Sequence, residues 1–441
     1  MIVLVEVHLG RRIAYARKKN KLTQTDFAKK IHVSSSHLGN IETGKYQASN
    51  EIILLMSQSM DVPISYFLNW DKVNEVTGEI IELLFDAILN NDLEEAKQLL
   101  KSLKHPIECI QQEITINMLK AVYHIKRGRI NKALEIEEEY LSLFLPITEI
   151  EEYSSEFQLY YYYFLMQINF VKEEFEESYL SGKKILNIRT GKDYEFVQLL
   201  INLSNISMRL ALYEESLSYV NKAINIVEKQ NNNKLSFIAH IQLSALLINN
   251  KQYDRALNIV DRLREFAEQN ESEVIKSIAY QHIGTIYFNH EQYNKAISYF
   301  EKSEKLTGQL PIEIVQSIIT CYLKLAEYEK AKAYIELGEK YSTTEYNKMI
   351  ILAQKAEIYL LEGNEKMHWK IQKKTIQYFI QNDYLENIRY IYKYLGKYYY
   401  RQKRYKESAT YFMEMERVKD EEKKIKKRNP INGTMFLINT R

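Results

Sequence analysis

A short signal that returns every 35 to 45 residues limits most strongly what this 441-residue chain can fold into. It consists of a large residue followed three positions later by a small one, as in Tyr253 with Ala256 and Tyr293 with Ala296. Further copies begin at Tyr213, Tyr328, Leu93, Ile130, Phe175 and Tyr405. A period of this length is typical of solenoids built from paired helices, in which each repeat packs on its neighbours. The sequence therefore predicts an all-α fold with about nine helix pairs between residues 76 and 420.

The composition agrees with helices and with a reducing compartment. Five prolines and 13 glycines are few for this length, and 46% of the residues are hydrophobic, which is enough to build a core. The two cysteines, Cys109 and Cys321, form neither a disulfide framework nor a zinc ligand set. The apolar start is short and meets Glu6, so we do not interpret it as a signal peptide, and no apolar run could cross a bilayer. We therefore expect a cytoplasmic protein without membrane contact.

The charge of the chain is unevenly distributed. The net charge is only +2, yet residues 1–70 carry nine Lys and Arg against five acidic residues. A basic segment on a nearly neutral body indicates local contact with a polyanion, although a solvated charged face would look the same.

The first seventy residues predict five short helices. Thr23 and Ser34 are good N-caps because their hydroxyls accept hydrogen bonds from the unpaired amides of a first helical turn. Apolar residues then recur at helical spacing, as Phe27 and Ile31 do after Thr23. The expected helices span about Leu9–Asn20, Thr23–Ile31, Ser34–Glu42, Asn50–Met60 and Pro63–Leu68.

This segment resembles the helix-turn-helix domain of the phage-repressor and Xre type. The family pattern is LTQ-x-x-[LF]-A, a turn, and then S-x-x-x-[IL]-x-x-[IL]-E-x-G. The matching positions are Leu22, Thr23, Gln24, Phe27, Ala28, Ser34, Leu38, Ile41, Glu42 and Gly44. The resemblance implies that the helix after Ser34 lies in the major groove of double-stranded DNA. It also implies that Arg17 and Glu42 form a structural pair between the first and third helices.

The DNA-contacting residues follow from the same resemblance. Asn40 can read an adenine edge through its carboxamide, whereas the serines at the start of the helix discriminate less between bases. Gln24 matches the family residue that contacts a phosphate. The full expected set is Gln24, Ser34, Ser35, Ser36, His37, Asn40 and Lys45.

Two positions depart from the family pattern. His32 stands in the turn where the family usually has glycine, and a positive φ there costs a histidine on the order of 1 kcal/mol. Gly39 lies inside the third helix, where glycine costs about 1 kcal/mol relative to alanine. It indicates either local looseness or room for close approach to DNA.

The best copy of the repeat, residues 279–303, resembles a tetratricopeptide repeat. Its packing positions are Ala279, Gly284, Tyr287, Tyr293, Ala296 and Phe300. One untypical helix pair, with a hinge at Gly363-Asn364, is expected between residues 347 and 382. The resemblance implies a right-handed superhelical solenoid whose hollow is lined by the first helix of each pair.

Carboxamide side chains recur at the positions expected to face this hollow. One equivalent position is occupied by Asn202, Gln242 and His282, a second by Gln198 and Gln281, and a third by Asn249 and Asn289; Gln167, Asn205 and Gln316 are also expected to face inward. Each carboxamide offers a donor and an acceptor, as the backbone of an extended peptide does. The pattern predicts a peptide-binding face, unless Asn and Gln are simply tolerated on a solvated surface.

Tyrosines add to this candidate face. Most of the 35 tyrosines fit repeat packing, but four in a row, from Tyr160 to Tyr163, cannot all point into one core of a helix. We expect Tyr160 and Tyr163 to share one face and to look toward the hollow.

No catalytic or cofactor motif is present in the sequence. It has no phosphate loop, no G-x-G-x-x-G, no H-E-x-x-H and no nucleophile elbow, and its nine histidines are scattered. We therefore expect no enzyme activity, no cofactor and no metal. The basic C-terminal stretch is interpreted as a solvated tail, with contact to DNA as the alternative.

A repressor-type domain joined to such an array resembles the RRNPP group of peptide-pheromone regulators, the NprR type most of all. The expected organisation is a DNA-binding domain at 1–70, a linker at 71–75, a peptide-binding and dimerisation domain at 76–420 and a tail at 421–441. The resemblance implies a quorum-sensing regulator, switched by a short imported peptide, that acts as a homodimer or a higher oligomer.

Two alternatives remain open from the sequence. The repeats could dock a response-regulator protein and alter its phosphorylation, as the related Rap proteins do. The same peptide mechanism could instead control lysogeny or a mobile element.

Overall fold

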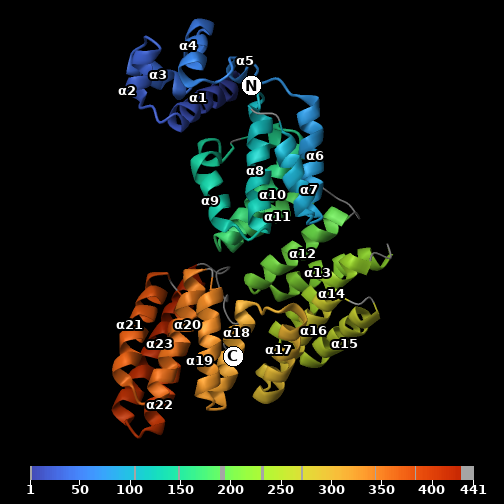
Figure 1. Ribbon diagram of the computed structural model, residues 1–441, viewed down its shortest axis with the longest axis vertical. Helices are drawn as coiled ribbons and strands as arrows, with labels where there is room; N and C mark the ends of the chain where they lie inside the picture. The colour runs from blue at the N-terminus through green and yellow to red at the C-terminus, as the bar shows by residue number, and fades with distance from the viewer. Residues whose placement is uncertain are drawn as a thin grey trace. The chain divides into compact units, whose positions relative to one another are not determined.

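The computed structural model describes residues 2–103, 106–147, 149–188, 194–229, 233–269, 272–342, 344–382 and 384–428. Every regular element in these ranges is a helix (Figure 1). The chain forms two compact units, Met1–Leu199 and Leu200–Arg441, which we describe separately. None of the described helices is both long and apolar enough to span a bilayer.

The first unit begins with five helices around one small core. They are α1 (Ile2–Lys19), α2 (Gln24–Lys30), α3 (Ser35–Glu42), α4 (Asn50–Met60) and α5 (Ser65–Leu68). The core includes Ile13, Phe27, Leu38, Met56 and Phe67, each of which is 0% exposed. These are the residues whose helical spacing predicted the elements.

The helix starts follow the predicted capping chemistry. Thr23 Oγ1 accepts a hydrogen bond from the Asp26 amide at 3.1 Å, and Ser34 Oγ accepts one from the His37 amide at 3.1 Å. The predicted start of α1 at Leu9 was wrong, because the helix already begins at Ile2. No proline interrupts the chain between these two residues, so the backbone helix extends past the amphipathic part that was recognised.

Three helix pairs follow in the first unit. They are α6 (Glu75–Leu89) with α7 (Leu93–Ser102), α8 (Ile110–Lys126) with α9 (Ile130–Glu139), and α10 (Ser155–Val171) with α11 (Phe175–Ile188). The 3-10 turns η1 (Leu141–Leu143) and η2 (Ile150–Glu152) lie between α9 and α10. The next helix, α12 (Tyr194–Arg209), contains the boundary between the two units.

The second unit continues the repeats. Its helices after α12 are α13 (Tyr213–Lys229), α14 (Asn233–Asn249), α15 (Tyr253–Gln269), α16 (Glu273–Asn289), α17 (Tyr293–Thr307), α18 (Ile312–Lys324), α19 (Tyr328–Tyr341), α20 (Glu345–Leu361), α21 (Glu365–Gln381), α22 (Leu385–Arg401) and α23 (Tyr405–Arg428). The described ranges therefore contain the nine predicted helix pairs, from α6–α7 to α22–α23. The predicted tail lies outside the described residues from 429 onward.

The small residue of each repeat signal is buried between the two helices of its pair. Ala256, Ala296 and Ala331 are 0% exposed. Where serine replaces alanine, its hydroxyl donates to a carbonyl 12 residues earlier: Ser216 Oγ to Ser204 at 2.7 Å, and Ser408 Oγ to Gly396 at 2.8 Å. Serine is therefore tolerated at this position because its polar group finds a partner in the preceding helix.

Candidate nucleic-acid interface and polar face of the repeats

The third helix turns its apolar side into the core and leaves its polar residues outside. Leu38 and Ile41 are 0% and 2% exposed, whereas Ser34 and Ser36 are exposed and Asn40 is partly exposed. The small residues at the start of α3 permit close approach to a surface. The predicted contacts at the start of this helix thus lie on accessible positions, and their role in DNA binding stays a prediction.

The chain after α3 folds back onto it. The amides of Lys45 and Tyr46 both donate to the Asn40 carbonyl, at 2.8 and 3.1 Å. Tyr46 is 49% exposed, and its ring lies 5.9 Å from that of His37. Tyr46 lies outside the predicted set because the family pattern ends at Gly44, and it is exposed beside the predicted contacts His37 and Lys45.

The turn between α2 and α3 has the predicted strained residue. His32 has a φ of 56°, the left-handed conformation that the family pattern usually assigns to glycine. The turn therefore keeps the family geometry without its usual residue.

A buried ion pair holds α1 to α3, as the resemblance implied. Arg17 Nε donates to Glu42 Oε1 at 2.6 Å and Arg17 Nη2 to Glu42 Oε2 at 2.9 Å, and both residues are 8% exposed. Gln24 Nε2 donates to the same Glu42 carboxylate at 3.0 Å. A phosphate contact by Gln24 stays a prediction, and the second hydrogen of this amide is available for it.

Gly39 has a role that neither sequence interpretation included. A Cβ atom on Gly39 would lie 3.3 Å from Gln24 Nε2, so the missing side chain makes room for Gln24 against α3. Gly10 allows a tighter approach, since a Cβ atom there would collide with the Ile41 carbonyl oxygen and lie 2.7 Å from that of Glu42. The two glycines set how closely α1 and α2 approach α3.

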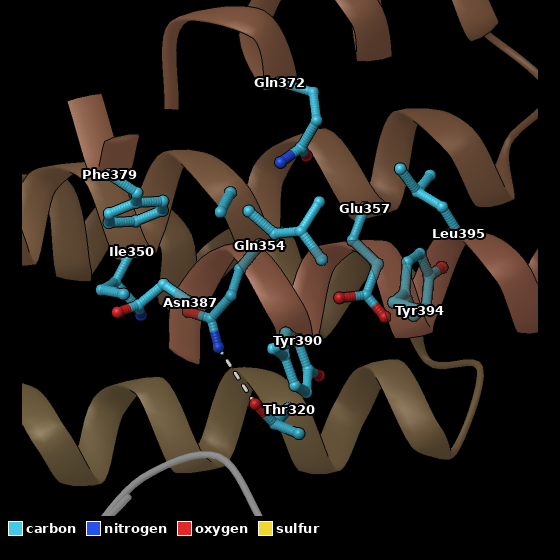
Figure 2. A pocket seen from close by; sticks show the side chains of 12 residues that line it. Thr320, Ile350, Gln354, Glu357, Gln372, Phe379, Asn387, Tyr390, Tyr394 and Leu395 are labelled. Atoms are coloured by element: carbon cyan, nitrogen blue, oxygen red, sulfur yellow. Dashed lines mark hydrogen bonds between the residues drawn. The ribbon is translucent and has the colours of Figure 1, made fainter. Parts of the chain in front are cut away.

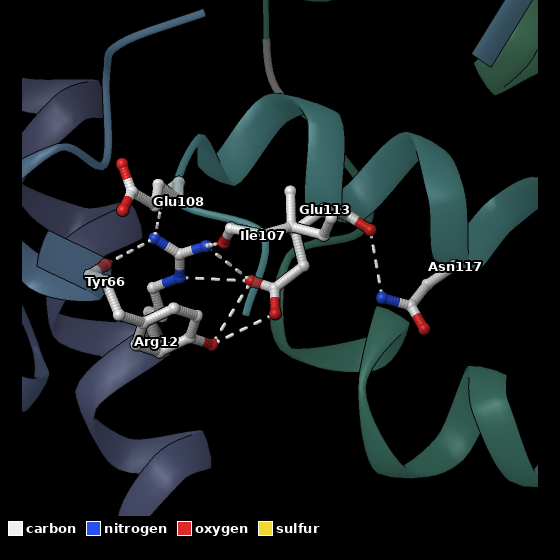
Figure 3. A network of polar contacts seen from close by, with 6 residues as sticks. All are labelled: Arg12, Tyr66, Ile107, Glu108, Glu113 and Asn117. Carbon is white, nitrogen blue, oxygen red and sulfur yellow. Dashed lines mark hydrogen bonds and ion pairs between the residues drawn. The ribbon is translucent and has the colours of Figure 1, made fainter. Parts of the chain in front are cut away.

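A buried arginine connects this domain to the first repeats (Figure 3). Arg12 of α1 is 0% exposed, and its guanidinium donates to Glu113 Oε2 of α8 at 2.8 and 3.0 Å. It also donates to the carbonyls of Tyr66, Ile107 and Glu108. Such a fork uses all sides of a planar guanidinium, which lysine could not reproduce.

Aromatic residues add further contacts between the first five helices and the repeats. The Tyr66 ring lies 3.7 Å from the Arg12 guanidinium carbon, and its hydroxyl donates to Glu113 Oε1 at 3.0 Å. Burial, followed by the Glu113 charge, raises the pKa of Tyr66 far above its ordinary value, so this hydroxyl stays a donor. Tyr15 of α1 packs edge-on against Tyr140, with ring centroids 4.8 Å apart. The five-helix domain is therefore packed on the repeats of its own unit.

The predicted linker is also held in place. The Asn74 amide donates to Gln112 Oε1 at 3.1 Å, and Gln112 Nε2 donates back to the Asn74 carbonyl at 2.8 Å. The Ile110 amide donates to the Trp70 carbonyl at 2.8 Å. The segment between α5 and α6 is thus bonded to the start of α8.

The four consecutive tyrosines of α10 are all buried, but, as expected, they do not all point into one core; the orientation of Tyr160 and Tyr163 toward the hollow stays a prediction. Tyr160, Tyr161, Tyr162 and Tyr163 are 8%, 4%, 9% and 2% exposed. Tyr160 and Tyr163 both pack edge-on against Phe85 of α6, and the Tyr161 hydroxyl accepts from the Ile147 amide at 3.4 Å. All four fit because packing surrounds this helix on more than one side.

Three of the predicted carboxamides in the second unit have buried amide nitrogens without a hydrogen-bond partner among the described residues. They are Asn202 Nδ2, Gln242 Nε2 and Gln316 Nε2. A buried donor without a partner costs about 1–3 kcal/mol, so each has a reason to bind an acceptor from outside the chain. These atoms come from α12, α14 and α18, the first helices of three pairs.

His282 continues this set in a neutral form. Ser244 Oγ donates to the Ile241 carbonyl at 2.8 Å and lies 2.7 Å from His282 Nδ1, so Nδ1 carries the proton and Nε2 is left as an acceptor. Burial lowers the pKa of His282 to about 4. The imidazole is therefore uncharged at neutral pH.

Other predicted residues of the peptide-binding face either form hydrogen bonds inside the chain or are partly exposed. Gln281 Nε2 donates to Ser303 Oγ at 2.9 Å, and Asn249 Nδ2 donates to Met208 Sδ at 3.0 Å. The proposed equivalence of Gln198 and Gln281 was wrong, because they lie 18 and 15 residues before the small residues Ser216 and Ala296. Gln167, Gln198, Asn205 and Asn289 are partly exposed.

Gln354 is a member of the row that sequence reasoning missed. Asn202, Gln242 and His282 each lie 14 residues before the small residue of their repeat, and Gln354 lies 14 residues before His368. His368 occupies the small position, is 1% exposed, and its Nδ1 lies 2.9 Å from the Ala356 carbonyl 12 residues earlier. The signal was hidden because a histidine replaces alanine in this untypical repeat.

Comparisons with known proteins place the N-terminal part in a family. The helix-turn-helix family matches residues 13–67. The immunity repressor protein of Bacillus phage phi105 is 30% identical over 129 residues, which cover 28% of this chain and 90% of the repressor. The chain belongs to the helix-turn-helix family of these repressors. The HTH-type transcriptional regulator ImmR of Bacillus subtilis is 28% identical over 120 residues, covering 24% of this chain and 94% of ImmR.

The repeats match known structures in fold. The tetratricopeptide repeat family matches residues 278–309. A Rap protein complexed with competence and sporulation factor has a TM-score of 0.63 and 15% identity, covering 79% of this chain and 99% of that one. The quorum sensor NprR of B. thuringiensis in its apo form has a TM-score of 0.61 and 16% identity, covering 78% and 99%. NprR in complex with its cognate peptide NprX has a TM-score of 0.55 and 18% identity, covering 79% and 99%. These matches show that the repeats share the fold of a Rap protein and of NprR.

Proposed function

We propose that this chain is a transcriptional regulator whose affinity for operator DNA is controlled by a short peptide bound to its repeats. The observation that carries the peptide part is the set of buried, unpartnered amide nitrogens on Asn202, Gln242 and Gln316. Backbone carbonyls of an extended peptide are acceptors that would satisfy all three without requiring a particular sequence. The complexes of a Rap protein with competence and sporulation factor and of NprR with the peptide NprX, which share this fold, support the proposal.

The switch is a shift between two populations. A peptide changes DNA affinity only by as much as it prefers one conformation over the other, and a tenfold change takes about 1.4 kcal/mol. We propose that the regulator acts as a homodimer in the cytoplasm, because helix-turn-helix proteins usually read two half-sites.

The relatives favour a particular class of target genes. One is a phage immunity repressor, and the other is the regulator ImmR. Control of lysogeny or of a mobile element is therefore the form of the proposal that these similarities support. The alternative function is docking of a response-regulator protein on the repeats. In that case DNA binding would not depend on any peptide.

Fluorescence anisotropy of the full chain on the DNA upstream of its own gene tests the proposal. We expect saturable, salt-dependent binding at least about tenfold tighter than to random DNA, and a further change when the peptide is added. Asn40→Ala should weaken specific binding about tenfold or more, while the neighbouring exposed Thr43→Ala serves as a matched control. Binding no tighter than to random DNA, with and without peptide, would overturn the proposal.

A further inference from the structure

A pocket in the second unit lies where four helices of the C-terminal repeats meet (Figure 2). It is lined by residues of α18, α20, α21 and α22 and has about 540 Å³ of empty space, part of which is open to solvent. Its walls combine apolar groups such as Phe379 with a few polar ones, as ligand pockets do. Two of its carboxamides present oxygens that have no hydrogen-bond partner among the described residues.

The orientation of Gln354 aims an oxygen into this pocket. Its Nε2 donates to the Gln316 carbonyl at 2.9 Å and to Thr320 Oγ1 at 3.0 Å. Because the carbonyl can only accept, the amide cannot be turned the other way. Gln354 Oε1 is thereby left buried without a partner among the described residues.

Two further oxygens line the same pocket. Asn387 Oδ1 is buried without a partner in the described part of the chain, and its Nδ2 lies 3.5 Å from the Tyr346 hydroxyl. Glu357 is only 8% exposed and lies beside Tyr394 (Figure 2). A carboxyl and two carboxamide oxygens thus line one small space.

No cation of the chain neutralises Glu357 within the described residues. Lys324 is the nearest charge that acts on it, but Lys324 is exposed and the two form no ion pair there. Burial raises the pKa of Glu357 to about 7, which is the expected behaviour of a carboxyl without a counter-ion. A buried acid and unpaired acceptors are each unfavourable until a ligand brings donors.

We propose that this pocket, defined by Gln354, Glu357 and Asn387, binds a basic side chain, arginine or lysine, of the peptide that the repeats recognise. This inference rests on the proposed function, since it adds a specificity-determining subsite to the peptide-binding face. A guanidinium or ammonium group carries only donors and a positive charge, which matches a site made of acceptors and one carboxyl. The rings of Phe379 and Tyr390 provide the apolar wall for its aliphatic stem.

Other ligands fit this pocket less well. A divalent metal ion prefers several carboxylates, and Glu357 is the one carboxyl among the lining residues. An anion would be repelled by the Glu357 carboxyl and by the unpartnered oxygens of Gln354 and Asn387. Gln354 connects this pocket to the row of amides proposed to bind the peptide backbone. Its Nε2 donates to the main-chain carbonyl of Gln316, which belongs to that row.

Affinity selection from a random hexapeptide library on the immobilised full chain tests the inference. Wild type is compared with Glu357→Gln, which keeps the shape but removes the charge, and with Glu336→Gln, an exposed glutamate of α19, as the matched control. A retained peptide is then resynthesised with its basic residue replaced by norleucine. Circular dichroism melting establishes that each variant is folded.

We expect peptides retained by wild type and by Glu336→Gln to be enriched in arginine or lysine at one position. Wild type should prefer the basic peptide over its norleucine analogue by about tenfold or more, and Glu357→Gln should lose this preference while still retaining peptides. Retention without a basic preference, or a preference that survives in Glu357→Gln, would overturn the subsite and leave the proposed function standing. No retention of any peptide by wild type would overturn both.

Discussion

Single buried charged residues affect the stability of the DNA-binding domain and of the repeats. Arg17 and Glu42 form a paired charge inside the helix-turn-helix domain, whereas Glu357 is a buried acid without a counter-ion. The two cases call for opposite expectations, because a paired charge stabilises the fold only while its partner is present and an unpaired acid prefers to be neutral.

Glu42→Ala should destabilise the helix-turn-helix domain by about 3–5 kcal/mol, because it leaves Arg17 buried without its partner. Hydrogen exchange of the α1–α3 amides measures this loss. Replacing both residues with methionine should recover most of the stability, since no unpaired charge remains. Unchanged exchange in Glu42→Ala would show that the pair contributes nothing to the fold.

Glu357 predicts a stability that falls as pH rises. Its pKa is about 7 in the folded chain against an ordinary value of 4.5, so between these values the folded state binds more protons than the unfolded state. Stability is therefore greatest below pH 4.5 as far as this group is concerned, and decreases by up to about 3 kcal/mol toward pH 7.

The groups that face Glu357 are Lys324 of α18 and Tyr390 and Tyr394 of α22. Both tyrosines have pKa values raised by burial, so they stay neutral in this range. The measurement is the difference in melting temperature between wild type and Glu357→Gln from pH 5 to pH 8. A difference that does not change with pH would contradict the assignment.

At the scale of helices, close packing is decided by small residues at a few positions. Gly10 lies against the backbone of α3, whereas Gly39 faces the flexible end of the Gln24 side chain. The same substitution should therefore have different results at the two sites.

Gly10→Ala should destabilise the DNA-binding domain by roughly 2 kcal/mol or more, because the added methyl meets backbone carbonyls that cannot move separately. Gly39→Ala is the matched control: Gln24 can shift by a few tenths of an ångström, and alanine favours the helix by about 1 kcal/mol. Thermal unfolding followed by hydrogen exchange in α1–α3 compares the two. Equal destabilisation by both variants would contradict the claim that Gly10 faces rigid backbone and Gly39 a flexible side chain.

Sequence patterns predicted the helices well where the deciding interaction is local. The caps at Thr23 and Ser34 and the positive φ at His32 depend on neighbours within a few residues, and the buried alanines depend on a regular repeat. The start of α1 at Ile2 was missed because a helix needs no amphipathic pattern where nothing breaks it.

Contacts between distant elements were not predictable in the same way. The room that Gly39 makes for Gln24 and the burial of four consecutive tyrosines depend on which helices surround them. The Arg12 network joins residues about a hundred positions apart, and Gln354 was hidden by His368 at a position where the pattern expects a small residue. Aligning the repeats by the position of their helices, and not by the small residue, would have found Gln354 at the same position as Asn202, Gln242 and His282.

At the scale of the whole chain, a helix-turn-helix domain is joined to an array of repeats that we propose to bind a peptide. Within the first unit this link is physical, because Arg12 and Tyr15 of α1 contact α8 and the segment after α9. A change in the repeats of that unit therefore has a direct route to the DNA-binding domain.

Arg12→Ala should separate the two parts, because it leaves Glu113 without its cation and three carbonyls without their arginine donor, at a cost of about 3–5 kcal/mol. We expect the amides of α1–α4 to exchange faster while those of α6–α11 change little. Arg11→Ala, at the neighbouring and partly exposed position, is the control. Equal exchange in Arg12→Ala and Arg11→Ala would show that the network does not hold the domain.

The most direct test of the proposed switch is the double variant Asn202→Ala with Gln242→Ala, measured by anisotropy on operator DNA with and without a peptide that wild type retains. We predict that DNA affinity without peptide stays within about twofold of wild type, while the change caused by peptide disappears, since the amides proposed to bind the peptide backbone are gone. A peptide response that survives in the double variant would contradict the assignment of these residues as the peptide-binding row.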